Sequence, residues 1–207
     1  DVDPERLTGV SGNITEMTWA EIQDLRIKQS INVGDKTIDY GKEERIVLLE
    51  DVLEEARGKL LVNIEVKAYR IDFNQRHTGK AVAELIRRMD IAHDVFVTSF
   101  NFWPLLWLER TYPGIESGFV YSPMFIKNWF RRTVMESSLM GKLIRSTVTN
   151  MSLNMFDDDT IEKVQAKGLA VGAWTVFSHD AKWLGETISP EQELEIVEDL
   201  AARGIDY

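Results

Sequence analysis

Apolar residues along the chain follow two different periods. Short apolar runs rich in β-branched and aromatic residues predict buried strands at residues 60–65, 95–100, 118–121, 151–156 and 170–176. Apolar residues that recur every three or four positions predict helices at residues 46–56, 80–89, 102–110, 124–143, 158–167 and 190–203. This alternation of strands and helices predicts an α/β protein whose parallel sheet is covered by helices on its faces.

The periodicity leaves two architectures open, a (β/α)8 barrel and a doubly wound sheet. No predicted strand is followed by a glycine-rich phosphate-binding turn, which weakens the dinucleotide-binding form of the second architecture. A complete barrel usually takes about 250 residues. If the fold is a barrel, we therefore expect this chain to cover only part of it, because a barrel that lacked strands would expose unpaired backbone groups at two edges.

The composition is that of one globular domain. The chain has 207 residues, of which 44% are hydrophobic and 28% charged, and no repeat or linker divides it, so we predict a single domain over residues 1–207. It has no cysteine, which leaves oxygen and histidine ligands for any metal. The net charge of -10 argues against a nucleic-acid partner. No apolar run approaches the roughly 20 residues of a membrane span, and the compartment and oligomeric state stay open.

The predicted strand at residues 60–65 leads into the most informative polar pair. Glu65 and Lys67 lie two residues apart, so the strand period places them on one face. At the carboxyl end of a barrel strand, a carboxylate suits a hard cation and a lysine suits a phosphate. The pair indicates a divalent-metal phosphoester site, and the alternative is a strand end whose charges simply reach solvent.

Four stretches of the chain carry known motifs in a specific order and spacing. They are residues 6–12 with the following segments 18–22 and 48–53, residues 63–67 (NIEVK), residues 97–101 (VTSFN) and residues 168–176 (GLAVGAWTV). Together they resemble the glycerophosphodiester phosphodiesterase family, within the phospholipase C-like phosphodiesterase superfamily. The resemblance implies that Glu65 binds a metal, Mg²⁺ or Ca²⁺, that Lys67 faces the substrate phosphate, and that Trp174 lines the glycerol pocket.

The same resemblance implies a (β/α)8 barrel of which this chain covers about strands three to seven. The family's strand one carries a His-Arg motif, its strand two carries a Glu-x-Asp metal pair, and a His-Asp dipeptide follows. The spacing from Arg6 places that aspartate at Asp1 and the histidine just before it. We therefore expect strands one, two and eight, two catalytic histidines and two metal ligands to lie outside the 207 residues, and the chain alone to be inactive.

None of the three histidines matches a catalytic position of the family. His77 stands in a polar stretch between two predicted elements, His93 precedes a strand and so lies at the non-catalytic end of a barrel, and His179 follows one. We expect His77 to be an ordinary surface residue. Four tryptophans are expected to pack against the core or cover the sheet, namely Trp103, Trp107, Trp129 and Trp183.

The resemblance implies metal-dependent hydrolysis of glycerophosphodiesters to glycerol 3-phosphate and an alcohol, in lipid or glycerol metabolism. Two departures, Phe177 where asparagine is common and a long segment at residues 178–189, leave the alcohol group open. The alternatives are a related phospholipase-like phosphodiesterase and a catalytically inactive barrel that binds a phosphorylated ligand or a protein.

Overall fold

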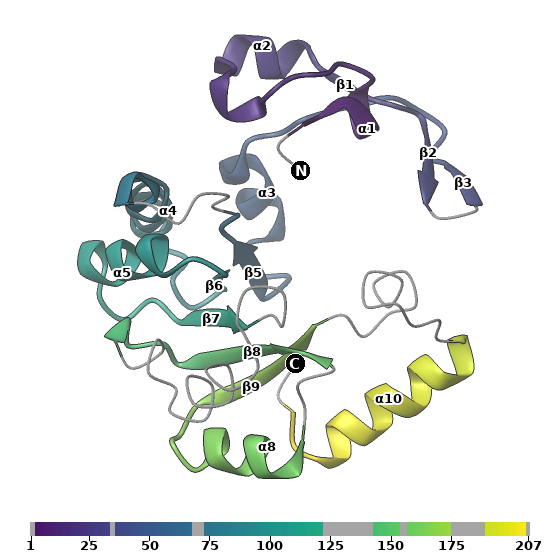
Figure 1. Ribbon diagram of the computed structural model, residues 1–207. Coiled ribbons are helices and arrows are strands. Elements are labelled where there is room, and N and C mark those ends of the chain that lie inside the picture. The colour runs from purple at the N-terminus through teal and green to yellow at the C-terminus, as the bar shows by residue number, and fades with distance from the viewer. Residues whose placement is uncertain are drawn as a thin grey trace. The chain divides into compact units, whose positions relative to one another are not determined.

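The computed structural model describes residues 3–33, 36–67, 73–121, 143–153, 157–174 and 189–205. Contacts divide the chain into two compact units, Asp1–Glu55 and Ala56–Tyr207 (Figure 1). The single domain over residues 1–207 stays a prediction.

The first unit consists of short elements. Its helices are α1 (Glu5–Thr8), η1 (Ile14–Glu16) and α2 (Trp19–Asp24), and its strands form two antiparallel pairs, β1 (Arg26–Ile27) with β4 (Glu44–Arg45) and β2 (Ser30–Val33) with β3 (Lys36–Asp39). The apolar pattern did not predict these strands because they are short and largely exposed. Helix α3 (Leu49–Ala56) spans the boundary between the units and begins three residues later than predicted.

Helix α2 begins with a reciprocal pair of hydrogen bonds. The Thr18 hydroxyl accepts from the Glu21 backbone N–H, and the Glu21 carboxylate accepts from the Thr18 backbone N–H at 2.7 Å. This capping box satisfies two backbone donors that the first turn would otherwise leave without partners. The hydrogen bonds from the Thr18 backbone and side chain lower the pKa of Glu21.

The second unit is built on one parallel sheet of five strands in chain order. They are β5 (Val62–Glu65), β6 (Val95–Ser99), β7 (Ser117–Tyr121), β8 (Val148–Ser152) and β9 (Ala170–Trp174). The sheet curls as its parallel strands succeed one another (Figure 1). The prediction of an α/β protein with a parallel sheet is therefore confirmed.

Strand β8 differs from its prediction. It begins at Val148 rather than Met151, because its first half contains Thr149 and Asn150, which do not read as an apolar run. Both are nevertheless buried, at 2% and 6% exposure. A strand buried on both faces can thus carry polar residues that conceal it from an apolar pattern.

Helices cover one face of this sheet. Helix α5 (Phe102–Thr111) contacts β6 and β7, α4 (Arg76–Met89) packs on α5 beside η2 (Phe73–Gln75), and α8 (Asp158–Gln165) contacts β9. Helix α10 (Pro190–Ala202) is largely exposed. Four of the predicted helices are thus confirmed with shifted ends. The helix predicted at 124–143 lies almost entirely outside the described residues. None of the described helices is long and apolar enough to cross a membrane.

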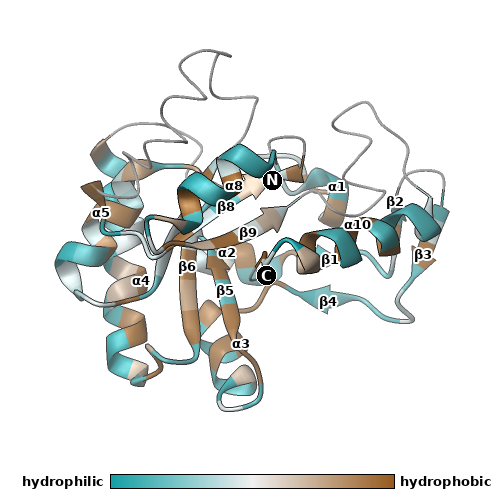
Figure 2. Ribbon diagram, turned by 90° about the horizontal axis from the view of Figure 1, so that it is seen from below, coloured by the Kyte–Doolittle hydropathy of each residue, from teal (hydrophilic) through white to brown (hydrophobic). Residues whose placement is uncertain are grey.

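Helices α4 and α5 approach each other closely at Gly79. A Cβ atom on Gly79 would lie 1.9 Å from the carbonyl oxygen of Pro104, so only glycine fits this crossing. Leu105 and Leu108 of α5 are fully buried, and the ribbons of β5 and β6 are largely brown in Figure 2, the colour of hydrophobic residues. This packing holds the two strands that carry most of the site.

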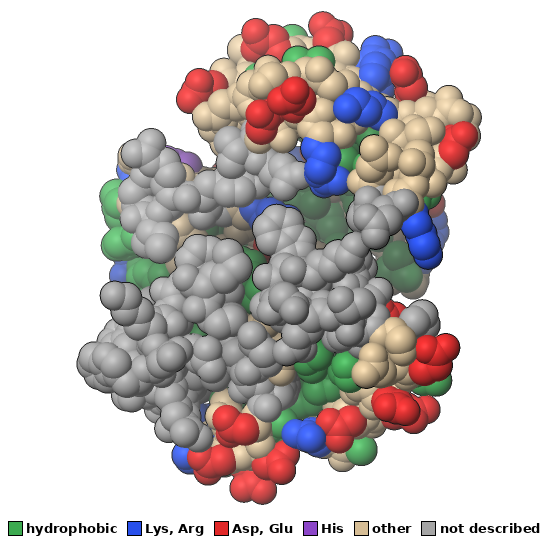
Figure 3. All heavy atoms as spheres, turned by 45° about the vertical axis from the view of Figure 1, so that its right-hand side comes forward, with side chains coloured by type: hydrophobic (Ala, Val, Ile, Leu, Met, Phe, Trp, Pro, Cys, Tyr) green, Lys and Arg blue, Asp and Glu red, His purple; other side chains and the backbone are tan. Residues whose placement is uncertain are grey.

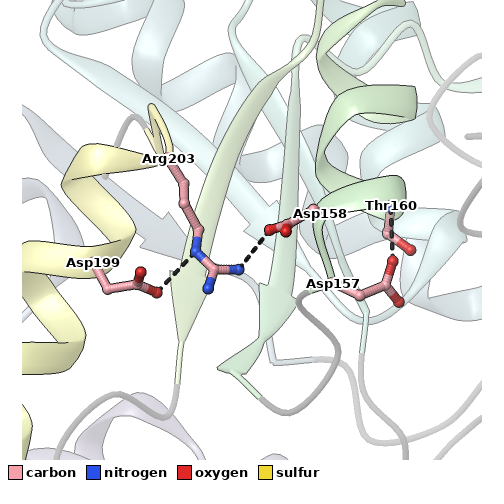
Figure 4. Close-up of polar contacts among 5 residues, drawn as sticks. All are labelled: Asp157, Asp158, Thr160, Asp199 and Arg203. Carbon is pink, nitrogen blue, oxygen red and sulfur yellow. Dashed lines mark hydrogen bonds and ion pairs between the residues drawn. The ribbon is translucent and has the colours of Figure 1, made fainter.

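Arg203, just after α10, links that helix to α8. Its Nη1 lies 2.9 Å from Asp158 Oδ1, and its Nε lies 2.8 Å from Asp199 Oδ2 (Figure 4). Asp157 caps α8 by accepting a hydrogen bond from the Thr160 backbone N–H at 2.8 Å. Acidic side chains gather over α8 and α10 at the lower end of Figure 3, and Arg203 balances two of them.

Candidate active site

Burial separates the two faces of β5. Ile64 and Val66 are 7% and 5% exposed, whereas Asn63, Glu65 and Lys67 are exposed. Because successive side chains alternate across a strand, the polar residues share the face that the helices do not cover. We refer to this as the open face of the sheet.

The register extends the open face across all five strands. Glu65 pairs with Thr98, which pairs with Gly118, and the row continues through Val148 to Ala170. Just beyond the two strands, Lys67 follows Val66 and Phe100 follows Ser99, and the Ser99 hydroxyl donates to the Val66 carbonyl at 2.7 Å, so Lys67 and Phe100 are close neighbours. Trp174, which pairs with Ser152, belongs to the same face at the end of β9. The structure therefore brings the three predicted site residues, Glu65, Lys67 and Trp174, to the open face at the carboxyl ends of their strands.

A partly buried hydrogen bond lies beside Glu65. Thr98, its register partner on β6, is 1% exposed and donates through Oγ1 to Asn63 Oδ1 at 2.9 Å. Asn63 precedes Glu65 by two residues on the same face, so the bond ties β5 to β6 at the base of the carboxylate. The pattern analysis did not single out either residue, since nothing in a single strand reveals its cross-strand partner.

The segment that follows β6 holds the backbone between Glu65 and Lys67. Ser99 Oγ donates to the Val66 carbonyl at 2.7 Å and accepts from the Asn101 backbone N–H at 3.0 Å. Asn101 in turn caps α5, because its Oδ1 accepts from the Trp103 backbone N–H at 3.0 Å. Ser99 and Asn101 of the VTSFN stretch thus tie the end of β6 to Val66 and to the start of α5, a role that the family resemblance did not predict.

Trp174 is held by one contact from the end of β7 and another from Phe100, just after β6. Its Nε1 donates to the Tyr121 carbonyl at the end of β7 at 3.0 Å. Its ring lies 5.3 Å from the ring of Phe100, centroid to centroid, at an interplanar angle of 83°. The indole is therefore fixed at the carboxyl end of the sheet, and Phe100 is a site residue that pattern analysis missed.

The described residues offer an incomplete donor set for a metal. Within them, no group of three or more His, Asp or Glu side chains gathers to hold an ion. The Glu65 carboxylate is of the type that Mg²⁺ and Ca²⁺ accept, but one carboxylate does not make a site. The Mg²⁺ or Ca²⁺ cofactor and the role of Glu65 as its ligand stay predictions.

The histidines lie away from this edge or outside the described residues. His77 belongs to the first turn of α4 rather than to a polar loop, and its side chain is exposed. His93 lies before β6, at the amino edge, with Nε2 3.7 Å from Asp94 Oδ1. His179 lies outside the described residues, as do Trp129, Phe177 and Trp183.

Two of the remaining tryptophans pack against an aromatic ring of η2, and their expected role in the core or over the sheet stays a prediction. Trp103 and Trp107 of α5 both contact the ring of Phe73 edge-on, each with centroids 5.2 Å apart. Arg76 stacks over Phe73 at 3.9 Å, and Arg110 lies 4.9 Å from the ring of Trp107. These residues form a surface cluster against α5.

A hollow of about 560 Å³ opens at the opposite edge of the sheet, lined by residues that include Leu61, His93, Phe96 and Val148. These residues precede or begin their strands. In parallel α/β folds the functional groups gather at the carboxyl ends instead. The hollow therefore does not belong to the candidate site.

Comparison with known proteins agrees with the resemblance. The model of the glycerophosphoryl diester phosphodiesterase family matches residues 1–199. A search of curated proteins finds no match.

Several solved structures share the fold. A glycerophosphodiester phosphodiesterase from Agrobacterium tumefaciens has a TM-score of 0.60 at 20% identity, over 90% of this chain and 72% of that one. An enzyme of the same description from Parabacteroides distasonis has a TM-score of 0.61 at 19% identity, over 91% and 74%. An Oleispira antarctica phosphodiesterase in complex with the product sn-glycerol-3-phosphate has a TM-score of 0.60 at 17% identity, over 96% and 77%. At these identities the structures support the fold, while the family match over residues 1–199 shows that the chain belongs to the glycerophosphoryl diester phosphodiesterase family.

Proposed function

We propose that this chain carries part of the active site of a glycerophosphodiester phosphodiesterase, which releases glycerol 3-phosphate and an alcohol. The observation that carries the proposal is that Glu65, Lys67 and Trp174 all lie at the carboxyl ends of strands of one curled parallel sheet. A carboxylate, a cation and a fixed aromatic ring suit a substrate that combines a phosphodiester with a small carbon skeleton.

Lys67 would stabilise charge on the phosphoryl oxygens. Its side chain is exposed at the mouth, and the Val66 carbonyl just before it is fixed by Ser99 at 2.7 Å. A lysine on a fixed backbone can meet the negative charge that grows in the transition state with less reorganisation than one on a free loop. Trp174, held through Nε1 by the Tyr121 carbonyl, would pack against the carbon face of the glycerol.

Glu65 would supply one ligand of the divalent metal, Mg²⁺ or Ca²⁺. Such an ion acts as a Lewis acid toward a phosphodiester when it is bound. The other two carboxylates and the two histidines that act as general base and general acid would come from residues upstream of Asp1, as the family resemblance implies. We therefore propose that the 207 residues alone do not hydrolyse the substrate.

We propose that the five strands belong to a (β/α)8 barrel, as strands three to seven. The curled parallel sheet in chain order and the TM-scores of 0.60 to 0.61 with the three structures compared above support this architecture. In barrel enzymes the catalytic groups come from the carboxyl ends of several strands, and that is the edge to which Glu65, Lys67 and Trp174 belong.

The test is an assay of the full-length protein with a panel of glycerophosphodiesters, with glycerol 3-phosphate and the alcohol measured separately. We expect release of glycerol 3-phosphate that EDTA abolishes and that added Mg²⁺ or Ca²⁺ restores, and no release by the 207-residue chain. Phosphocholine in place of glycerol 3-phosphate would instead identify a phospholipase C-like activity. Binding of glycerol 3-phosphate without any turnover would identify an inactive ligand-binding barrel.

A further inference from the structure

We propose that Phe100 forms, with Trp174, the surface that binds the carbon skeleton of the substrate, and so helps to set the enzyme's affinity for the glycerol group. This proposal rests on the proposed function and adds to it a second aromatic residue. The observation behind it is the contact between the ring of Trp174, at the end of β9, and the ring of Phe100, just after β6, 5.3 Å from centroid to centroid.

The contact crosses the open face of the sheet. Phe100 directly follows β6 and Trp174 ends β9, with β7 and β8 between them. Three strand spacings amount to about 14 Å in a flat sheet, so the two side chains must lean toward each other over the ends of the intervening strands. Curling of the sheet shortens that path on the side toward which it bends.

The rings of Phe100 and Trp174 are held in a defined orientation. Trp174 has its Nε1 hydrogen bond to the Tyr121 carbonyl, 3.0 Å long, so rotation of the indole would break a partly buried hydrogen bond. The interplanar angle of 83° is the edge-to-face arrangement that aromatic pairs prefer. Both side chains are only half-buried, which leaves apolar surface on a rigid pair.

The pair lies beside the predicted phosphate-binding lysine. The Ser99 hydroxyl donates to the Val66 carbonyl at 2.7 Å, and Lys67 and Phe100 directly follow these two residues, so they are close neighbours in the chain segments just beyond β5 and β6. A cation next to an aromatic surface matches a molecule with a phosphate at one end and C–H groups beside it. Phe100 would then contact the carbon atoms nearest the phosphate.

A second aromatic pair offers a matched control. Phe119 and Tyr121 have ring centroids 4.9 Å apart at 64°, and they are 8% and 1% exposed. They alternate with Gly118 and Val120 and so belong to the helix-covered face of β7. Loss of the Phe119 ring should therefore disturb packing without removing surface from the site.

The experiment measures equilibrium binding of glycerol 3-phosphate and of inorganic phosphate to full-length wild type, Phe100→Ala, Phe100→Leu, Phe119→Leu and Lys67→Ala. Inorganic phosphate lacks the carbon skeleton. We expect Phe100→Ala to weaken binding of glycerol 3-phosphate about tenfold, the order of effect of one aromatic contact, and to leave binding of phosphate unchanged. The affinity of Phe100→Leu for glycerol 3-phosphate should lie between those of wild type and Phe100→Ala. Phe119→Leu should bind both ligands like wild type, and Lys67→Ala should bind both more weakly.

The outcomes separate this proposal from the proposed function. Wild-type affinity of both Phe100 variants for glycerol 3-phosphate, in a protein that releases this product and depends on Lys67, would overturn the role of Phe100 alone. Equal weakening of both ligands by Phe100→Leu would also overturn it, because that result indicates general disruption. A wild type that neither hydrolyses glycerophosphodiesters nor binds glycerol 3-phosphate would overturn both proposals.

Discussion

Two buried serines on adjacent strands differ in whether their hydroxyl groups form hydrogen bonds. Ser99 of β6 and Ser117 of β7 are both 0% exposed. Ser99 Oγ makes two hydrogen bonds, to the Val66 carbonyl and from the Asn101 backbone N–H, whereas Ser117 Oγ has no partner within the described residues. Removal of a hydroxyl should therefore have opposite consequences at the two positions.

We expect Ser99→Ala to lower the free energy of unfolding by about 1–3 kcal/mol, because it removes two buried hydrogen bonds to backbone groups. Ser117→Ala should change it by less than about 0.5 kcal/mol or raise it, since it removes a polar atom that is buried without compensation. Urea denaturation of the two variants measures both values. Equal destabilisation would contradict the hydrogen-bond assignment at Ser99.

Glu21 is the residue whose charge state the capping box controls. The Thr18 backbone N–H and hydroxyl lower the pKa of its carboxyl, so the folded protein favours the ionised form. The resulting stabilisation of α2 is fully present above the ordinary glutamate pKa of about 4.3 and is lost as the pH falls through the lowered value.

We expect Thr18→Val to raise the pKa of Glu21 toward its ordinary value without reaching it, because the backbone N–H of residue 18 still donates. An NMR titration of the Glu21 carboxyl carbon measures this directly. An unchanged titration curve in the variant would show that the Thr18 hydroxyl makes no bond to the carboxylate in solution.

At the scale of elements, the crossing of α4 and α5 depends on one glycine. Replacing a glycine in an ordinary helix interior with alanine stabilises the helix by about 1 kcal/mol. At Gly79 the added Cβ would lie 1.9 Å from the Pro104 carbonyl oxygen, so we expect a loss of about 1–3 kcal/mol from overpacking.

Thr78→Ala is the control for this prediction, because Thr78 is exposed in the same turn of α4 and should change stability by no more than about 0.5 kcal/mol. Thermal unfolding of both variants decides the question. A stabilised Gly79→Ala variant would mean that the two helices do not cross as closely as described.

Sequence patterns predicted the elements of the sheet well where burial followed a simple period. The five strands and α4, α5, α8 and α10 were found because their apolar residues recur at strand or helix spacing. Strand β8 was placed three residues late because buried Thr149 and Asn150 interrupt its apolar run. The short pairs β1–β4 and β2–β3 were missed because they bury too little to produce a pattern.

At the scale of the whole molecule, the site was only partly predictable. Alternation along one strand was enough to place Glu65 and Lys67 on one face. The contacts of Trp174 with Phe100 and with the Tyr121 carbonyl join residues more than 50 positions apart in the chain. Such contacts depend on the curl and register of the sheet, which no local pattern contains.

The central claim is that Lys67, at the carboxyl end of β5, acts on the phosphate of a glycerophosphodiester. The most direct measurement is the rate of glycerol 3-phosphate release from glycerophosphocholine by the full-length protein and by its Lys67→Ala and Lys59→Ala variants. Lys59 lies just before β5, at the opposite end of the strand from Lys67, and both lysines are exposed. We predict a fall of about 10²–10³-fold for Lys67→Ala, the usual cost of removing one preorganised charge-stabilising group, and a near wild-type rate for Lys59→Ala. A wild-type rate in the Lys67→Ala variant would contradict the account.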